Sequence, residues 1–256
     1  EDGNSDKANH SSQRCPNGAG APFETGVYAQ FASTPGAENV CEVVVEPISC
    51  DANTLVFTAI PTIQGSGATS PIVGNIDDIE AVVTADFQAG AAGESGDLNG
   101  FYVQDAGDGD PATSDGIFVF STAVDVAVGD LVRVRGEVVE FETSGGASSL
   151  TEIGNVQGVA VCASGTAVPA AVDVTFPLAS VDEMEQYEGM LVNFPQELVI
   201  SEYFNFDRFN EIVISLPLAG LDRPIQPTAY VEPGAAALAV ADEIALNRIT
   251  LDDGRT

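Results

Sequence analysis

Positive charge is what this chain most lacks. Of its 256 residues, 39 are Asp or Glu and only 8 are Lys or Arg, so the formal net charge is −31. A surface of this kind repels nucleic acid, anionic lipid and other copies of itself unless cations intervene. DNA binding would therefore need bridging cations or a basic domain elsewhere. The balance is typical of a secreted protein in a saline or calcium-rich environment.

Residue types that serve many catalytic sites are also scarce. Tryptophan is absent, histidine occurs once, at His10, and no two cysteines form a CxxC pair. A structural or catalytic zinc site is therefore not expected. Carboxylates are plentiful, but no pair stands out for glycoside hydrolysis, and no tryptophan offers a platform for a sugar ring. No catalytic residue is recognised and no organic cofactor is expected, so an enzyme in its own right is the weakest interpretation.

Long apolar runs are missing too. None reaches the roughly 20 residues of a membrane-spanning helix, and we expect no membrane span. The chain opens on polar residues without a visible signal peptide. A processed secreted protein would begin in this way.

What is present is a series of short strands. Alternating apolar and polar residues predict strands at 79–87, 100–105, 116–121, 131–141 and 149–162. The long fourth strand contains a glycine, which lets a strand bend sharply. Five strands with one such curved member are the pattern of an OB-fold barrel. We therefore expect an all-β protein built on this barrel.

Three parts are expected along the chain. Residues 1–60 form an N-terminal segment with strand-forming runs, and residues 61–165 form the barrel. Residues 166–256 form a second, smaller β-rich, OB-like region. A helix is predicted at 233–247, where Pro-Gly is followed by strong helix formers. The chain stops after LDDG (251–254) without an evident closing element, so we expect this region to be cut short or completed by something else.

The four cysteines predict disulfides and an oxidising compartment, because their number is even in an acidic, lysine-poor chain. Cys50 precedes the first barrel strand and Cys162 follows the last. A bond between them would join the entry of the barrel to its exit. In the chain-entropy model, closing so long a loop stabilises by up to about 4–5 kcal/mol. Cys15 and Cys41 would then hold the N-terminal segment.

An acidic, glycine-rich loop joins the second and third predicted strands. It places Asp105, Asp108, Asp110 and Asp115 within eleven positions. These carboxylates and nearby carbonyls could supply the six to eight oxygens that Ca²⁺ prefers, although the spacing is not that of an EF-hand. The alternative is a solvated loop that uses Asp and Gly for turn geometry. Calcium is the one cofactor that the sequence suggests.

The outer face of the barrel is a second candidate site. If Phe101, Val103, Ile117, Val119, Val132 and Val134 point inward, the residues between them point outward. The outward set that could bind nucleic acid is Tyr102, Phe118, Phe120, Arg133 and Arg135. Aromatic rings for stacking and arginines for phosphate are what OB-folds use on single strands. The alternative is that another part of the chain or a partner covers these rings.

Two further segments suggest contacts between molecules. The aromatic cluster of Tyr203, Phe204, Phe206 and Phe209, with Arg208, either packs as a β-hairpin into the core of the second region or contacts a partner. The strand-like residues 40–60 either pair within the chain or add a strand to a neighbour. A head-to-tail contact of the second kind that does not close would generate a filament.

Several motifs, in the right order, resemble the OB-fold-like accessory region of large secreted bacterial endonucleases of the endonuclease/exonuclease/phosphatase class. The resemblance covers about residues 60–256. Its motifs are IQGSGATSPIVG (63–74), VVTADFQ (82–88), GFYVQDAGDGDPATSDGIFVF (100–120), VGDLVRVRGEV (128–138), YEGMLVNFPQELVISEYFNFDRFNEIVIS (187–215) and LDDG (251–254). The resemblance implies an extracellular parent protein whose catalytic histidines, glutamate and asparagines lie in a separate domain. No catalytic residue can be carried over to this chain.

Two functions therefore compete. The first is a non-catalytic accessory module of a secreted nuclease-related protein, which contacts extracellular DNA through divalent cations. The second is a calcium-stabilised structural subunit of an extracellular fibre or surface assembly, a homo-oligomer held by strand pairing between subunits.

Overall fold

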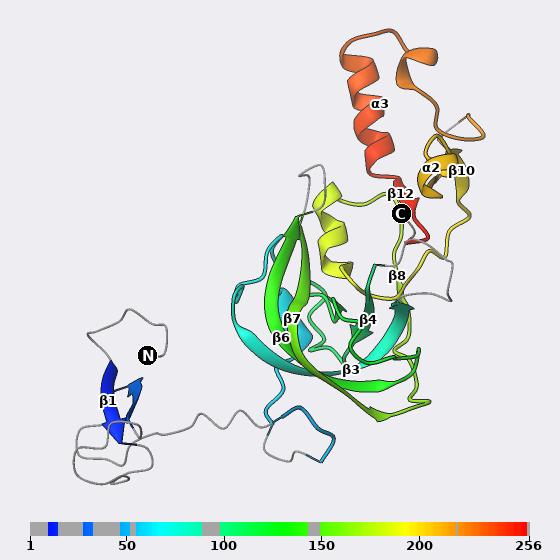
Figure 1. Ribbon diagram of the computed structural model, residues 1–256. Helices are drawn as coiled ribbons and strands as arrows, with labels where there is room; N and C mark the ends of the chain where they lie inside the picture. Colours follow the sequence, from blue (N-terminus) through cyan, green and yellow to red (C-terminus); the bar gives the residue numbers. More distant parts are fainter. Residues whose placement is uncertain are drawn as a thin grey trace. The chain divides into compact units, whose positions relative to one another are not determined.

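A computed structural model describes residues 10–14, 28–32, 47–51, 55–88, 98–142, 149–218 and 220–254. It divides into two compact units, Glu1–Pro47 and Ile48–Thr256. In the first unit, β1 (His10–Arg14) pairs antiparallel with β2 (Tyr28–Ala32). All other described helices and strands belong to the second unit (Figure 1).

A closed five-stranded barrel forms the centre of the second unit. Its strands are β3 (Ile76–Phe87), β4 (Gly100–Gln104), β5 (Gly116–Val119), β6 (Leu131–Glu142) and β7 (Ser149–Ala163). They follow one another around the barrel in the order β3-β4-β5-β7-β6. The pair β5/β7 is parallel and the other pairs are antiparallel. The expected all-β barrel and its five strands are confirmed, with ends that differ by a few residues.

Period-two alternation fills the inside of the barrel. The six residues expected to point inward, Phe101, Val103, Ile117, Val119, Val132 and Val134, are all 0% exposed. In β6 the alternation continues past Gly136, where the register with β7 shifts. A Cβ at Gly136 would lie 2.4 Å from a methyl of Ile153. Glycine is therefore needed where β6 bends around the core.

A short helix that the sequence did not predict packs against the barrel core. This helix, α1, spans Ile60–Gln64. Pro61 suits the first turn of a helix, and Ile60 and Ile63 are fully buried in the barrel core. The strand expected over 40–60 is not seen in its described part: residues 47–51 and 55–59 belong to no strand.

The rest of the unit is built from short elements. They are β8 (Val172–Asp173), η1 (Val181–Tyr187), β9 (Val192–Asn193), β10 (Val199–Glu202), α2 (Phe206–Phe209), β11 (Ile212–Ser215), η2 (Pro227–Ala229), α3 (Ala235–Ala245) and β12 (Arg248–Leu251). Strands β10, β11 and β12 form an antiparallel sheet. A small second core gathers around Val174, Phe176 and Leu178. The helix predicted at 233–247 is present as α3. All of these short elements belong to the same compact unit as the barrel.

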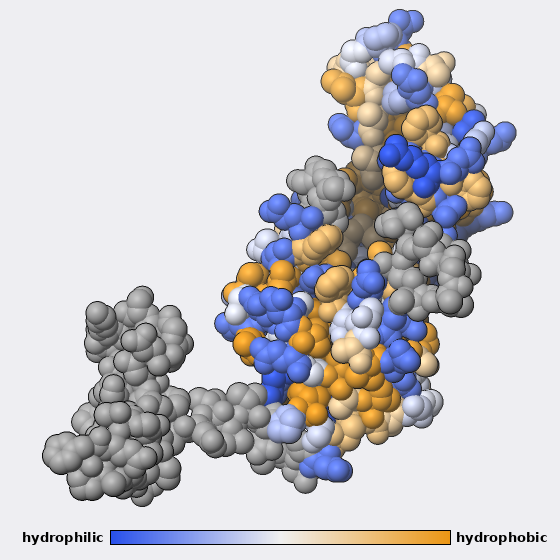
Figure 2. Space-filling model, in the orientation of Figure 1, coloured by the Kyte–Doolittle hydropathy of each residue, from blue (hydrophilic) through white to orange (hydrophobic). Residues whose placement is uncertain are grey.

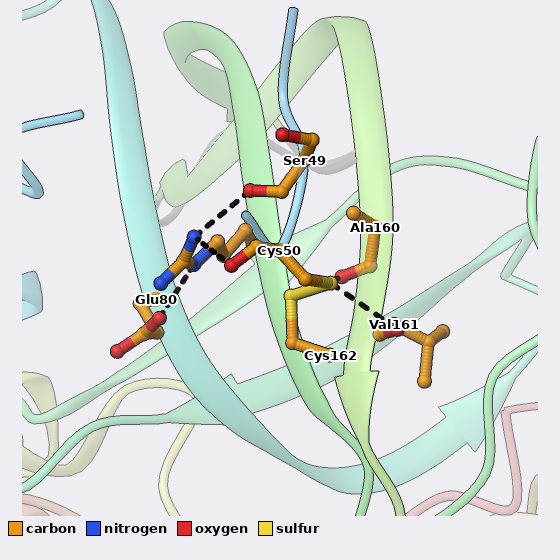
Figure 3. Close-up of a disulfide and its surroundings, with 7 residues drawn as sticks. Ser49, Cys50, Glu80, Ala160, Val161 and Cys162 are labelled. Carbon is orange, nitrogen blue, oxygen red and sulfur yellow. Dashed lines mark hydrogen bonds and ion pairs between the residues drawn. A yellow bond between two sulfur atoms is a disulfide. The ribbon is translucent and has the colours of Figure 1, made fainter. Parts of the chain in front are cut away.

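A disulfide between Cys50 and Cys162 ties the segment before the barrel to the end of β7, as predicted (Figure 3). It joins residues 112 apart in sequence, with the Cα atoms at 5.2 Å. Cys15 and Cys41 lie outside the described residues. Among the described helices, none combines the length and apolar character that crossing a membrane requires.

Candidate functional site

The acidic loop between β4 and β5 is held by its own aspartates. Asp105 accepts hydrogen bonds from the backbone N–H groups of Ile60 and Gly107, each at 2.8 Å. The carboxylate thereby joins the loop to the first residue of α1. A left-handed backbone at Gly107 (φ +69°) brings the chain against Asp115. A Cβ there would lie 2.5 Å from the Asp115 carboxylate oxygens, so this approach requires glycine.

The next two aspartates close tight turns. Asp108 accepts from the backbone N–H of Asp110 at 2.8 Å, and Asp110 accepts from that of Ala112 at 3.0 Å. The hydroxyl of Thr113 also donates to Asp108, at 3.3 Å. Side-chain bonds of this kind to the backbone two residues ahead are Asx-turns. The turn geometry named as the alternative to calcium is thus present.

Asp115 differs from the other aspartates of the loop in that one of its carboxylate oxygens is buried and accepts no hydrogen bond. It is half-buried, and its Oδ1 atom is buried without a hydrogen-bond partner. Its pKa is raised, first because burial disfavours the charged form and then because of the negative charges on Asp105 and Asp108. Three of the four aspartates are thus close enough to interact electrostatically. The part of the chain described contains no group of three or more His, Cys, Asp or Glu residues arranged to hold a metal ion.

The predicted aromatic face is partly assembled and partly covered. The rings of Tyr102 and Phe118 lie 4.9 Å apart, and the ring of Phe87 lies 6.0 Å from Tyr102. Phe118 is only 4% exposed, although it points away from the barrel interior. Phe120 follows β5 and is half-exposed.

A strap formed by residues 187–191 lies against the start of β5 and beside Tyr102. Its backbone passes so close to β5 that a Cβ at Gly116 would lie 2.4 Å from the carbonyl carbon of Gly189. The Leu191 N–H donates to Gln104 at 2.9 Å, and the Ser114 hydroxyl donates to the Glu188 carbonyl at 2.5 Å. Gln104, which accepts the bond from Leu191, is only 2% exposed. Between the strap and the barrel, a cavity of about 240 Å³ remains next to Tyr102.

The two arginines of the predicted set serve the barrel wall. Arg135 on β6 pairs with Asp78 on β3 through two bonds of 2.5 Å, and both side chains are 12% exposed. Arg133 donates to Glu80 at 2.6 Å. It also donates to the carbonyls of Ser49 and Cys50, at 2.8 and 3.0 Å (Figure 3). These contacts hold the segment before the barrel to its wall beside the disulfide.

Of the expected set Tyr102, Phe118, Phe120, Arg133 and Arg135, the structure brings together Tyr102 and Phe118, whereas the two arginines lie on a strand that is not adjacent to β4 or β5. The aromatic residues belong to β4, β5 and the residue after β5, whereas the arginines belong to β6, which lies between β3 and β7. The prediction treated β4, β5 and β6 as neighbours because they follow one another in the sequence. In the barrel, however, β6 pairs with β3 and β7 and is not adjacent to β4 or β5. The sequence did contain a signal for this pairing. Asp78 and Glu80 on β3 are two residues apart, as Arg133 and Arg135 are on β6, and each acidic residue lies directly opposite one arginine.

Sequence reasoning missed a group of interacting carboxylates around Glu188, which belongs to the strap itself. Glu188 accepts from the Thr151 N–H at 2.9 Å. Its pKa is raised to about 7, mainly by burial, with further contributions from the charges of Glu185 and Glu140. Hydrogen bonds from Thr151 and Gln64 act in the opposite direction. No motif or spacing pointed to Glu188. The one local signal is the glycine after it, which lets the backbone reach β5.

The cluster extends to the aromatic face. Burial raises the pKa of Glu152 on β7. The pKa of Tyr102 is raised first by burial and then by the charges of Glu188 and Glu152. Glu140 by contrast is well bonded, since it accepts from Thr151 Oγ1 at 2.8 Å and from the Ser70 N–H at 2.7 Å. The strap thus places a carboxylate near Tyr102 whose negative charge is unfavourable there.

A scan against protein-family models and a search of curated proteins each found no match.

Proposed function

We propose that Ile48–Thr256 is a non-catalytic OB-fold module of a secreted, nuclease-related protein, and that it contacts extracellular DNA through divalent cations. The strand order β3-β4-β5-β7-β6 supports the OB-fold, because that fold is a five-stranded Greek-key barrel. The motifs at 63–74, 100–120 and 187–215 support the relation to secreted nucleases. The disulfide supports an oxidising compartment.

One observation carries the cation requirement: both barrel arginines are already paired. Arg135 is held by Asp78 and Arg133 by Glu80. A phosphate that took either guanidinium would leave a carboxylate unpaired in a partly buried place, which is costly. Phosphate contacts dominate the affinity of most DNA-binding proteins. With both barrel arginines paired and a net charge of −31, a bridging Ca²⁺ at the acidic loop would supply the positive charge that the barrel surface does not offer to phosphate.

Asp105, Asp108, Asp110 and Asp115 are the proposed ligands of this ion. Asp115 is the strongest candidate, because its buried Oδ1 lacks a hydrogen-bond partner and an ion would relieve its repulsion with Asp105 and Asp108. An incoming Ca²⁺ would be bound through these carboxylates together with water and backbone carbonyls.

A fluorescence-anisotropy titration with labelled single- and double-stranded oligonucleotides tests the function. We expect binding in the presence of Ca²⁺ and none with chelator. The double variant Asp108→Asn/Asp115→Asn should lose this binding. Asp125→Asn, which removes an exposed charge from another loop, should retain it. Absence of binding to both oligonucleotides with and without Ca²⁺ would refute the proposed DNA contact.

A second function is favoured by the exposed aromatic run after β10. Tyr203, Phe204 and Phe206 are 69%, 87% and 51% exposed. Figure 2 shows apolar residues in orange among hydrophilic ones in blue in the part of the picture where β10 and α2 lie. Strands β10 and β12 are also the edges of their sheet, and unpaired edges can take up a strand from another chain.

These features suit a calcium-stabilised subunit of an extracellular fibre or surface assembly. Light scattering and electron microscopy at high protein concentration, with and without chelator, distinguish it from the first function. A fibre subunit would form large assemblies that chelation dissolves. A monodisperse monomer in both conditions would remove this function.

A further inference from the structure

A cavity of about 390 Å³ lies beside the β10–β12 sheet, away from the barrel residues discussed above. Its lining includes Ser201 and Glu202 from β10, Arg223 and Ile225 from the segment before η2, Ile244 from α3 and Arg248 from β12. Its volume falls within the range of roughly 300–1,000 Å³ that is usual for small-molecule sites.

Two arginines give this cavity a positive lining in a strongly negative molecule. Arg223 donates through Nη1 to the Ser201 carbonyl at 3.1 Å. The side chain is exposed, and this bond uses one of the five N–H donors that a guanidinium carries. Arg248 lines the cavity from β12. Against these two charges the lining holds one carboxylate, Glu202, in a chain whose net charge is −31.

The pair between Arg248 and Glu202 is weak. Their closest charged atoms, Nη1 and Oε2, are 3.9 Å apart, and the side chains are 44% and 53% exposed. Exposed pairs of this kind contribute little to stability. The barrel pair Arg135–Asp78, at 2.5 Å and 12% exposure, is the opposite case. An anion can therefore replace Glu202 as the partner of Arg248 at low cost.

We propose that this cavity binds the phosphate group of a small phosphate monoester. The fork of a guanidinium matches phosphate oxygens in a bidentate manner, and a dianionic group would engage Arg223 and Arg248 together. The apolar wall of Pro224, Ile225 and Ile244 takes the organic body that the phosphate carries. Glu202 competes with the ligand for Arg248 and weakens its binding.

Calorimetric titration of the full chain tests this site with three probes: phenyl phosphate, inorganic phosphate and benzoate. At low ionic strength and a pH of about 7.5, a phosphate monoester is mostly dianionic, because its second pKa is about 6. We expect saturable binding of phenyl phosphate with a Kd on the order of 1 mM. Inorganic phosphate should bind more weakly because it lacks the apolar body, and benzoate more weakly because it carries a single charge.

Three variants decide between this site and general attraction to arginine. Arg248→Gln should weaken phenyl phosphate binding by about tenfold. Glu202→Gln should strengthen it by about threefold, because the competing charge is gone. Arg208→Gln, which alters an arginine stacked on Phe209 in α2 and outside the cavity lining, should leave it unchanged.

Each contrary outcome overturns the proposal. Absence of saturable binding up to about 10 mM phenyl phosphate would mean that the cavity has no useful affinity. An equal loss in Arg208→Gln would mean that charge alone attracts the probe. Unchanged or weaker binding in Glu202→Gln would contradict the role of Glu202, and this variant retains both arginines.

Discussion

At Glu188, the cost of burying a carboxylate exceeds the benefit of its hydrogen bonds. Its pKa rises from 4.5 to about 7 on folding, with burial as the main cause. The pKa values of Glu152, Glu185 and Asp115 are also raised mainly by burial. All four groups hold their protons more tightly in the folded protein than in the unfolded chain. The folded state is therefore favoured by mild acid.

The pH dependence of stability should follow from this sign. For Glu188, the free energy of unfolding should be highest below pH 4.5 and should fall as the pH rises to about 7. Because this group is only partly buried, we expect a change of about 1–2 kcal/mol after allowance for solvent screening. Glu188→Gln should reduce the slope and raise the stability at neutral pH. Urea unfolding at several pH values measures both effects.

The control is Glu197→Gln, which removes the same charge from an exposed position. It separates the effect of Glu188 from a general relief of the net charge of −31. Equal slopes in the two variants would contradict the assigned role of Glu188.

Among the elements, the barrel strands were predictable and the parts that cover them were not. Inward residues such as Phe101 and Val132 alternate at period two, and this local pattern sufficed to place the strands. Helix α1 has five residues, too few for a periodic signal. The sequence of the strap shows no hydrophobic periodicity either. Its position depends instead on the close approach of its backbone to Gly116. The outward direction of Phe118 was predictable, but its burial was not, since it depends on the packing of its ring against Tyr102 and the backbone of Gly100 on β4.

Gly116→Ala should lift the strap from the barrel. The added methyl would lie 2.4 Å from the Gly189 carbonyl carbon and 2.7 Å from the Met190 nitrogen, so the backbone must move. We expect a loss of about 1–3 kcal/mol in the free energy of unfolding. Faster hydrogen exchange over residues 187–191 should accompany this loss.

Gly67→Ala is the matched control, because a Cβ there meets nothing within 4 Å. If exchange over the strap were equally slow in both variants, the strap would not depend on contact with β5.

On the scale of the whole molecule, the disulfide and the salt bridges close the barrel where its chain enters and leaves. Cys50 and Cys162 are joined, and Arg133 binds the carbonyls of Ser49 and Cys50 (Figure 3). The positions of these cysteines around the predicted strands were enough to predict their pairing. The arginines were assigned to nucleic acid instead, because a linear sequence does not show which strands become neighbours when a barrel closes.

Reduction should test the contribution of this bond. Cys50→Ser should lower the free energy of unfolding by an amount on the order of 4 kcal/mol in the chain-entropy model, as a consequence of the long loop it opens. A reductant should lower the melting temperature of the native protein. It should lower that of Cys50→Ser much less. An equal decrease in both proteins would assign the effect to other cysteines.

The molecule carries a net charge of −31 while its two barrel arginines are held in ion pairs, so the proposed function depends on a bound divalent cation. Calorimetric titration of Ca²⁺ into the full chain measures this binding, with Asp108→Asn/Asp115→Asn and Asp125→Asn as the variant and its control. We predict a saturable heat that the double variant loses and the control retains. No saturable heat, or the same heat in the double variant, would contradict a calcium site at the loop between β4 and β5.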